Sequence, residues 1–333
     1  MSGKQMNVLR AGRPNGNGGG ALRPVMLAIA GDSGTGKTTI TAGLVEALGR
    51  DRITSVAADD YHRYDREERK ELPFTPLHPD CNYIDIMEQH LQHLALGEPI
   101  LKPVYDHDTG ELGRPEYVEP AEFVIVEGLL PLHTQLSRAC FDVTVFLDPP
   151  EDIRISWKLS RDTKKRGYTE DQVRKDLEKR EPESVEFIRP QRSYADIVVR
   201  FAPIEERGET ADDPLSATLL LRPTISHPEL HNILGDDTEE AMHLKLSRDE
   251  DGKPVDAVHI HSYADPKVTK KVEQAVWDEL GVDAAVPESL GQLDSDKRDE
   301  PLALTQLLLL YHLIQAREAL SASSSAADAI EQR

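Results

Sequence analysis

The sequence G-D-S-G-T-G-K-T at Gly31–Thr38 matches the phosphate-binding pattern G-x-x-x-x-G-K-[ST] at every fixed position. An apolar run at 25–30 precedes it and is typical of a buried strand, and residues 39–48 follow with the apolar spacing of a helix. Glycines let such a loop curl so that its backbone N–H groups point inward, and the helix adds the partial positive charge of its N-terminus. The stretch therefore predicts a polyphosphate-binding loop between a strand and a helix.

This motif also assigns roles to individual residues of the loop. Lys37 would reach the outer phosphates of ATP, and the Thr38 hydroxyl would join the ligand shell of a Mg²⁺ ion. ATP and Mg²⁺ are therefore the expected nucleotide and metal. The residues predicted to contact ATP are Gly31, Asp32, Ser33, Gly34, Thr35, Gly36, Lys37, Thr38 and Thr39.

The composition favours a small-molecule partner. The 333 residues include 60 acidic and 39 basic side chains, and the net charge of −21 should repel nucleic acid and anionic membranes. No apolar run approaches the roughly 20 residues that span a bilayer, and no stretch is typical of a signal peptide, so we expect a cytoplasmic protein. Cys81 and Cys140 are far apart in the sequence, which predicts neither a disulfide framework nor a zinc site.

Apolar runs divide the chain into a core and an extension. Further core strands are expected at 53–58, 123–128, 143–148 and 196–201. Runs at 217–222, 242–246 and 257–261 predict a second, antiparallel layer, followed by helices around 268–280 and 302–320. The expected fold is α/β, with a mostly parallel sheet flanked by helices and a strand-rich C-terminal extension. The predicted boundaries are a flexible tail at 1–23, a core at 24–205 with a basic lid around 158–190, an α+β extension at 206–320 and a flexible tail at 321–333.

Acidic side chains follow two of these strands. Asp59 and Asp60 follow the second, where catalytic groups of open parallel sheets collect, and either could approach a metal and accept a proton from an attacking hydroxyl. The alternative is that one of them caps a turn or pairs with an arginine. Glu127 ends the run at 123–128 and is placed to complete the Mg²⁺ shell.

Two further segments offer groups for a substrate. His62 and Arg66 share a face if their segment is helical, and a guanidinium suits a phosphate, although a solvated charged loop would look the same. Tyr105 and His107 lie in a predicted turn that fits either a substrate wall or a plain hairpin.

A basic segment interrupts the acidic chain. Residues 158–180 carry nine basic and five acidic side chains, a local balance of +4. Lys158 and Arg161 share a helix face, and the sequence from Arg166 to Thr169 supplies a glycine hinge and a helix cap. These features predict a lid that closes its cations over a transferring phosphoryl group, although solvated basic helix faces are common.

Taken together, these motifs resemble the phosphoribulokinase and uridine kinase family over about residues 25–202, with a looser likeness in the C-terminal third. The motifs that carry the resemblance are G-D-S-G-x-G-K-T at 31–38, D-D-Y-H-x-x-D-R at 59–66, Y-x-H-x-x-G at 105–110, V-E-G-L at 126–129, W-K-x-x-R-D at 157–162 with Arg166-Gly167, and P-Q-R at 190–192. The resemblance implies a P-loop kinase core and a homo-oligomer, most simply a dimer. It also implies an enzyme that transfers the γ-phosphoryl group of MgATP to the C1 hydroxyl of ribulose 5-phosphate, giving ribulose 1,5-bisphosphate and ADP.

The resemblance also assigns roles to residues. It implies that Asp59 is the catalytic base near the metal and that Glu127 is the second acid there. His62 and Arg66, helped by Tyr105 and His107, look like the sugar-phosphate grip. Among the lid cations, Lys158 and Arg161 would lie nearest the transferred phosphoryl group and Arg166 nearer the sugar phosphate, with Lys37 completing the catalytic set.

This chain departs from the family pattern at one position, and two alternative classes of function remain open beside the expected one. Photosynthetic members of the family carry a regulatory cysteine inside the loop, where this chain has Thr35, so redox switching of the plant type is not implied. A uridine-type nucleoside kinase, or a kinase of another sugar phosphate, is the nearest alternative enzyme. A nucleotide-binding regulator without turnover is the alternative from another class, but it would not need the proton acceptor Asp59.

Overall fold

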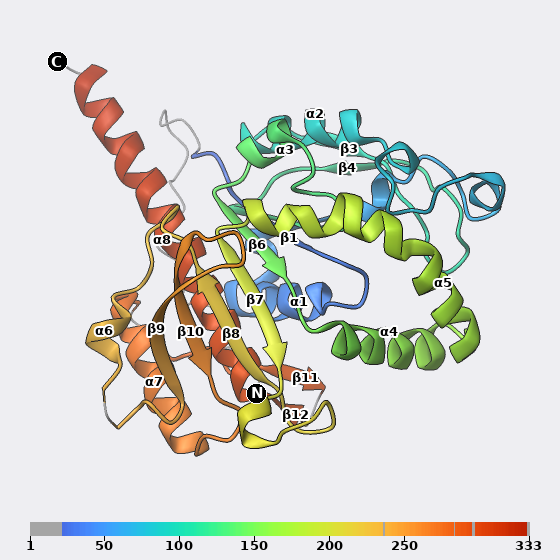
Figure 1. Cartoon of the computed structure of the whole chain (residues 1–333). Coiled ribbons are helices and arrows are strands. Elements are labelled where there is room, and N and C mark those ends of the chain that lie inside the picture. The colour runs from blue at the N-terminus through green and yellow to red at the C-terminus, as the bar shows by residue number, and fades with distance from the viewer. Residues whose placement is uncertain (1–21, 236, 283, 295–296, 332–333) are drawn as a thin grey trace, which may run out of the picture.

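One mixed sheet organises the part of the chain that the computed structural model describes, which is residues 22–235, 237–282, 284–294 and 297–331 (Figure 1). Its strands in spatial order are β2 (Ile53–Ala57), β5 (Phe123–Gly128), β1 (Val25–Gly31), β6 (Val143–Leu147), β7 (Ile197–Ala202), β8 (Ser216–Leu221), β10 (Pro254–Ile260) and β9 (Met242–Arg248). The predicted N-terminal tail lies outside the described residues, apart from positions 22 and 23.

The other elements are short hairpins and the helices. The hairpins are β3 (Ile100–Lys102) with β4 (Glu116–Val118), and β11 (Gln292–Asp294) with β12 (Lys297–Arg298). The α-helices are α1 (Lys37–Leu48), α2 (Ile84–Ala95), α3 (Gln135–Ala139), α4 (Glu151–Lys165), α5 (Glu170–Glu183), α6 (Leu230–Ile233), α7 (Pro266–Glu279) and α8 (Glu300–Glu331). Short 3₁₀ or π turns that bear on the site are η2 (Ala58–Tyr61), η3 (Glu68–Glu71), η5 (Ser184–Ile188) and η6 (Arg189–Tyr194).

The five strands β2, β5, β1, β6 and β7 pair in parallel, as predicted. The expectation of a separate second layer is wrong. Strand β8 pairs antiparallel with β7, and β10 and β9 continue from it, so the extension lengthens the core sheet. The reason is that β7 would otherwise expose an unpaired row of backbone donors and acceptors at the edge of the core.

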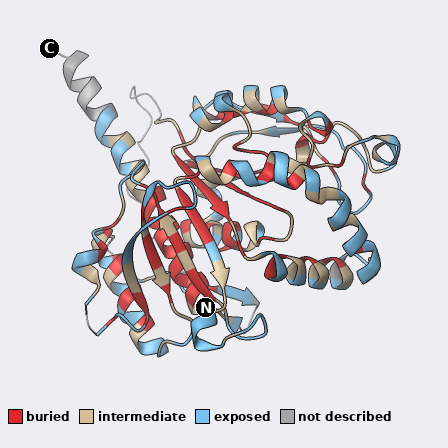
Figure 2. Cartoon of the chain, in the orientation of Figure 1, coloured by how far each residue is buried: buried red, intermediate tan, exposed pale blue. Residues whose placement is uncertain are grey.

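Helices cover the core sheet on both faces, and β1 is buried along its whole length (Figure 2). On one face, side chains of α1, α7 and α8 form a single core with β1, β6, β7, β8 and β10. On the other face, α2 packs over β1, β5 and β2. The carboxyl ends of the parallel strands meet at one edge, and the phosphate loop, η2 and the end of β5 lie there.

Helix α8 packs against both the core and the extension. Its buried Gln306 donates from Nε2 to the carbonyl oxygen of Thr39 at 3.0 Å and accepts from the backbone N–H of Gly291 at 2.8 Å. Thr39, predicted to contact ATP, is therefore tied to α8 through its backbone. The helix continues to Glu331, through the segment predicted to be a flexible tail, and projects from the body (Figure 1).

The predicted lid is a pair of helices, α4 and α5. Gly167 lies between them with a φ of 72°, and the side chain of Thr169 caps α5 in a reciprocal capping box with Gln172, as the sequence predicts. None of the helices in the described ranges combines the length and apolar character that crossing a membrane requires.

Candidate active site

The phosphate loop joins β1 to α1 as predicted. Gly34 and Gly36 have φ values of 91° and 92°, a conformation that side chains rarely adopt. A Cβ atom on Gly34 would also lie 2.8 Å from the Cβ atom of Lys158 on α4. The glycines therefore let the loop curl and let the lid helix approach it closely.

Lys37, predicted to bind phosphate, lies over this loop. Its Nζ atom donates to the carbonyl oxygens of Gly31 and Asp32, each at 2.8 Å. Burial lowers the pKa of Lys37, while the nearby carboxylates of Asp59 and Glu127 oppose that shift. The ammonium group is thus desolvated and held at the loop, where an anionic ligand would strengthen its charged form.

Residues far along the chain hold the loop in place. Ser184 of η5 donates to the Oδ2 atom of Asp32, and Arg154 of α4 donates to the carbonyl oxygen of Ser33 at 3.1 Å. The hydroxyl of Thr35 donates to the carbonyl oxygen of Asp32 at 2.9 Å. Sequence analysis missed Arg154 and Ser184, because no local pattern pairs residues separated by more than 100 positions.

An acid and two hydroxyls meet at the end of β5. Glu127 accepts hydrogen bonds from Thr38 at 3.3 Å and from Thr41 at 3.0 Å. Burial raises the pKa of Glu127, against the opposing effect of Lys37 and the two hydroxyls. Hard oxygen donors of this kind suit Mg²⁺, which takes few protein ligands and completes its shell with phosphate oxygens and water. Accordingly, no group of three or more His, Cys, Asp or Glu side chains among the described residues could hold a metal alone.

The neighbouring acids Asp59 and Asp60 in η2 have different environments. Asp60 is ion-paired with Lys102, and its Oδ1 atom accepts from the backbone N–H of Tyr105 at 3.1 Å. The carboxylate of Asp59 accepts no hydrogen bond from any described residue, but it lies close enough to Lys37 to influence its pKa. Asp60 therefore has the structural role that the sequence left open for one of the pair, and the role of Asp59 as a catalytic base stays a prediction.

Aromatic side chains predicted for the substrate pocket come together beside Asp59. The ring of Tyr105 contacts His62 at a centroid distance of 4.8 Å and His107 at 5.0 Å. Burial lowers the pKa of His62 to about 4, although Asp59 opposes the shift. Burial also lowers the pKa of His107, helped by the charge of Arg166. Both imidazoles are therefore uncharged at neutral pH, and positive charge at this wall comes from arginine side chains.

Arg66 shapes the loop that carries this wall. Its guanidinium donates to the carbonyl oxygens of His107 at 2.5 Å, Asp108 at 3.3 Å and Thr109 at 3.5 Å. Gly110 follows with a φ of 83°, and a Cβ atom there would lie 2.6 Å from the Cβ atom of Arg66. The predicted phosphate contact of Arg66 stays a prediction, since its donors face backbone oxygens in this structure.

Arg69 is a site residue that sequence analysis missed. Its guanidinium lies 4.7 Å from the ring centroid of Tyr105 and donates to the Tyr105 hydroxyl. Its Nη1 atom is buried and has no hydrogen-bond partner among the described residues. Arg66 lies in a turn and Arg69 in η3, so no helical spacing in the sequence indicated that Arg69 reaches this wall.

The three lid cations meet at one carboxylate, Asp162, which sequence analysis quoted only as part of a motif. Its oxygens lie 2.9 Å from Nζ of Lys158, 2.8 Å from Nε of Arg161 and 3.6 Å from Nη1 of Arg166. Although burial opposes the shift, the hydrogen bonds from Arg161 and Lys158 hold the pKa of Asp162 below its usual range. Arg161 also reaches the Ser33 hydroxyl at 3.3 Å, so the lid contacts the phosphate loop.

Proteins of known function match about half of this chain in sequence. A phosphoribulokinase of Synechocystis sp. is 40% identical over 181 residues, which are 54% of each chain. A uridine kinase of Oceanobacillus iheyensis is 35% identical over 185 residues, which are 53% of this chain and 86% of that protein. In these sequence matches, the chain thus spans about half the length of the Synechocystis phosphoribulokinase and most of the length of the uridine kinase.

The fold likeness reaches further than the sequence likeness. The solved phosphoribulokinase from Rhodobacter spheroides has a TM-score of 0.56 and is 15% identical, with 89% of this chain and 99% of that chain covered. The family model described as Phosphoribulokinase / Uridine kinase family matches residues 26–206, more than half of the sequence. The chain is therefore a kinase that belongs to the phosphoribulokinase and uridine kinase family.

Proposed function

We propose that this kinase transfers the γ-phosphoryl group of ATP to a hydroxyl of a pentose phosphate, namely the C1 hydroxyl of ribulose 5-phosphate. One observation carries the proposal. The carboxylate of Asp59 accepts no hydrogen bond within the described residues and lies close enough to Lys37 of the phosphate loop, and to His62 and His107 of the wall, to influence the pKa of each. A base in that place would accept the proton of a hydroxyl held against the wall.

The charges at the wall favour an acceptor with its own phosphate. His62 and His107 are uncharged, while Arg69 and Arg166 act on them as nearby positive charges. The buried, unpartnered Nη1 atom of Arg69 can donate to a phosphate oxygen, and guanidinium groups match phosphate geometry. An uncharged nucleoside would offer these guanidinium groups no charged acceptor of this kind.

On the nucleotide side, this chain's residues hold the polyphosphate and balance its charge. The loop N–H groups and Lys37 would bind it, and Lys158 and Arg161 would face it from the lid. Thr38 and Glu127 would hold Mg²⁺, which would supply positive charge against the phosphates of ATP. Closure of α4 and α5 excludes water that would otherwise hydrolyse ATP.

A nucleoside kinase is the second candidate, because the chain covers 86% of a uridine kinase at 35% identity. An acceptor panel decides between the two. ADP release would be measured with MgATP and ribulose 5-phosphate, ribose 5-phosphate, uridine or no acceptor, and products would be identified by ³¹P NMR.

We expect ribulose 5-phosphate to exceed uridine in kcat/KM by about 10²-fold or more, since uridine has no phosphate for the arginine side chains at the wall to bind. Equal turnover of uridine would overturn the proposed acceptor. ADP release that no acceptor stimulates would overturn the proposed transfer.

A further inference from the structure

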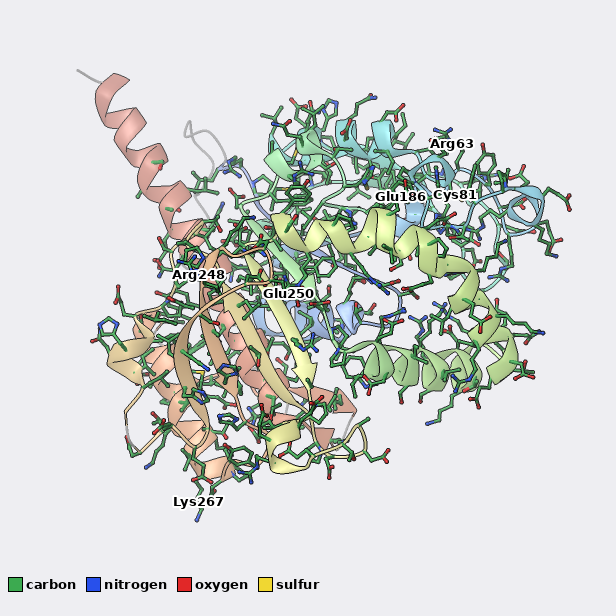
Figure 3. The ribbon with its side chains drawn as sticks, in the orientation of Figure 1. Arg63, Cys81, Glu186, Arg248, Glu250 and Lys267 are labelled. Atoms are coloured by element: carbon green, nitrogen blue, oxygen red, sulfur yellow. The ribbon has the colours of Figure 1, made fainter. Side chains whose placement is uncertain are left out.

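A buried side-chain pair joins the two strand-like segments behind the acceptor wall. His62 and Asn82 form an isolated antiparallel bridge and are only 4% and 6% exposed. Their chain neighbours Arg63 and Cys81 are linked by a backbone hydrogen bond of 2.9 Å and lie next to each other in Figure 3. The Nδ1 atom of His62 lies 2.7 Å from the Oδ1 atom of Asn82.

The surroundings of Asn82 decide which atom carries the proton. Its Nδ2 atom donates to the carbonyl oxygens of Pro76 at 3.0 Å and His78 at 2.9 Å. Carbonyl oxygens only accept, so the amide nitrogen must face them and Oδ1 must face His62. The Nδ1 atom of His62 is therefore the donor in this pair, and Nε2 of the uncharged ring carries a free lone pair.

The other ring nitrogen is available to a ligand. Within the described ranges, Nε2 of His62 has no hydrogen-bond partner. The charged and titratable groups around the ring are Asp59 from η2, Arg69 from η3, and Tyr105 and His107 from the loop between β3 and β4. Burial and the positive charge of Arg69 favour the uncharged ring, and Asp59 opposes them.

We propose that Asn82 is a positioning residue that fixes His62 as the Nδ1–H tautomer, so that Nε2 accepts a hydrogen bond from a hydroxyl of the acceptor substrate. The inference rests on the proposed function and refines it. In this arrangement His62 binds a hydroxyl of the pentose, and arginine side chains bind the phosphate of the acceptor.

The chemistry of the two groups supports this division. A phosphate dianion has oxygen acceptors and no proton to donate, so it would repel the lone pair of Nε2. A hydroxyl donates its proton to Nε2 and can still accept from another group. A site whose buried acceptor needs a donor discriminates strongly against a substrate that lacks the hydroxyl.

The first test measures the tautomer itself and needs no substrate. Protein labelled with ¹⁵N-histidine would be examined by NMR at pH 7.5, and the His62 signals identified by their loss in His62→Gln. We expect a protonated Nδ1 and an unprotonated Nε2. A protonated Nε2 in the wild-type protein would overturn the proposal, whatever the enzyme phosphorylates.

The second test uses Asn82→Asp, whose carboxylate favours a doubly protonated His62 and so removes the acceptor at Nε2. We expect KM for the pentose phosphate to rise by about tenfold or more, while KM for ATP stays within about twofold. His62→Gln is the background control, because it keeps a polar side chain that cannot be protonated.

In the His62→Gln background, Asn82→Asp should no longer change KM for the acceptor. The substitution removes the hydrogen bonds from Nδ2 to the carbonyl oxygens of Pro76 and His78 in both backgrounds, so their loss cannot explain a difference between the backgrounds. An equal effect in both backgrounds would show a structural role and contradict the proposal. If no acceptor is phosphorylated at all, the proposed function fails, and the NMR result still decides the tautomer.

Discussion

At the scale of single residues, burial decides which groups are charged. His62 and His312 are 4% and 3% exposed, and burial lowers their pKa values to about 4 and about 3. His312 is further disfavoured as a cation by its neighbour His227, while its Nδ1 atom pairs with the carbonyl oxygen of Ser226 at 3.1 Å. Both rings stay uncharged in the folded protein at pH values where the unfolded chain would bind protons.

This arrangement predicts a loss of stability in mild acid. The folded pKa values lie below the unfolded value near 6.5, so the stabilisation is present above pH 6.5 and is lost as pH falls toward 4. Between pH 7.5 and pH 5, the free energy of unfolding should fall by about 2 kcal/mol for each of the two histidines. Urea titrations at the two pH values measure this change.

The matched control for this prediction is His312→Gln, which cannot titrate. Its stability should fall by about 2 kcal/mol less than that of the wild type over the same pH range. A wild-type protein that is equally stable at pH 5 and pH 7.5 would contradict the assignment of uncharged buried histidines.

At the scale of elements, one carboxylate pairs with the cations of the predicted lid. Asp162 of α4 accepts from Lys158 and Arg161 and lies within 3.6 Å of Arg166. Lys158 is only 3% exposed, and burial lowers its pKa. Asp162 therefore keeps a desolvated ammonium charged and fixes the direction of two guanidinium groups.

Replacing the carboxylate of Asp162 should disorder the three cations around it, while the phosphate loop should still bind ATP. Asp162→Asn is expected to lower kcat by about 10²-fold, because charge stabilisation of the transferring phosphoryl depends on placed cations. ATP affinity, measured by calorimetry, should change far less than kcat. Asp171→Asn, in the exposed first turn of α5, is the control, and equal kcat values for the two variants would count against the organising role.

Local sequence patterns predicted some elements of the fold but not the contacts between elements. The phosphate loop, the five parallel strands and the cap of α5 were predictable because each depends on residues close together in the chain. Asp162 and Arg69 were visible in the sequence, but only the structure shows them against Lys158 and Tyr105. Ser184 could not have been predicted, because nothing near it in sequence indicates that it contacts Asp32.

At the scale of the whole molecule, the extension and the core share one sheet and one buried ion network. Arg192 of η6 binds Asp148 at 2.8 Å and Asp249 at 2.7 Å, and Asp249 is also paired with Arg222. Asp148 follows β6 in the core, and Asp249 follows β9 in the extension. The alternation of apolar residues predicted the strands on both sides but could not show that β8 would pair with β7.

The packing of α8 against α1 gives a prediction at this scale. A Cβ atom on Gly43 of α1 would lie 2.1 Å from the Nε2 atom of the buried Gln306. Gly43→Ala should therefore lower the free energy of unfolding by about 1–3 kcal/mol through overpacking. In a Gln306→Ala background the same change should cost nothing, since the obstacle is gone and alanine is the better helix former.

Urea unfolding of the four variants in this cycle measures the coupling. An equal loss in both backgrounds would show that Gly43 and Gln306 do not meet. It would also contradict the close packing of α8 against α1.

In the proposed reaction, Asp59 accepts the proton of the acceptor hydroxyl while the phosphate loop holds ATP. The most direct measurement is single-turnover transfer of the labelled γ-phosphoryl group from ATP to ribulose 5-phosphate by Asp59→Asn, with ATP binding measured by calorimetry on the same protein. Asp51→Asn, an exposed residue beyond α1, serves as the control. We predict that Asp59→Asn transfers about 10²- to 10⁴-fold more slowly than wild type and binds ATP with about the same affinity. Transfer at the wild-type rate would contradict the account.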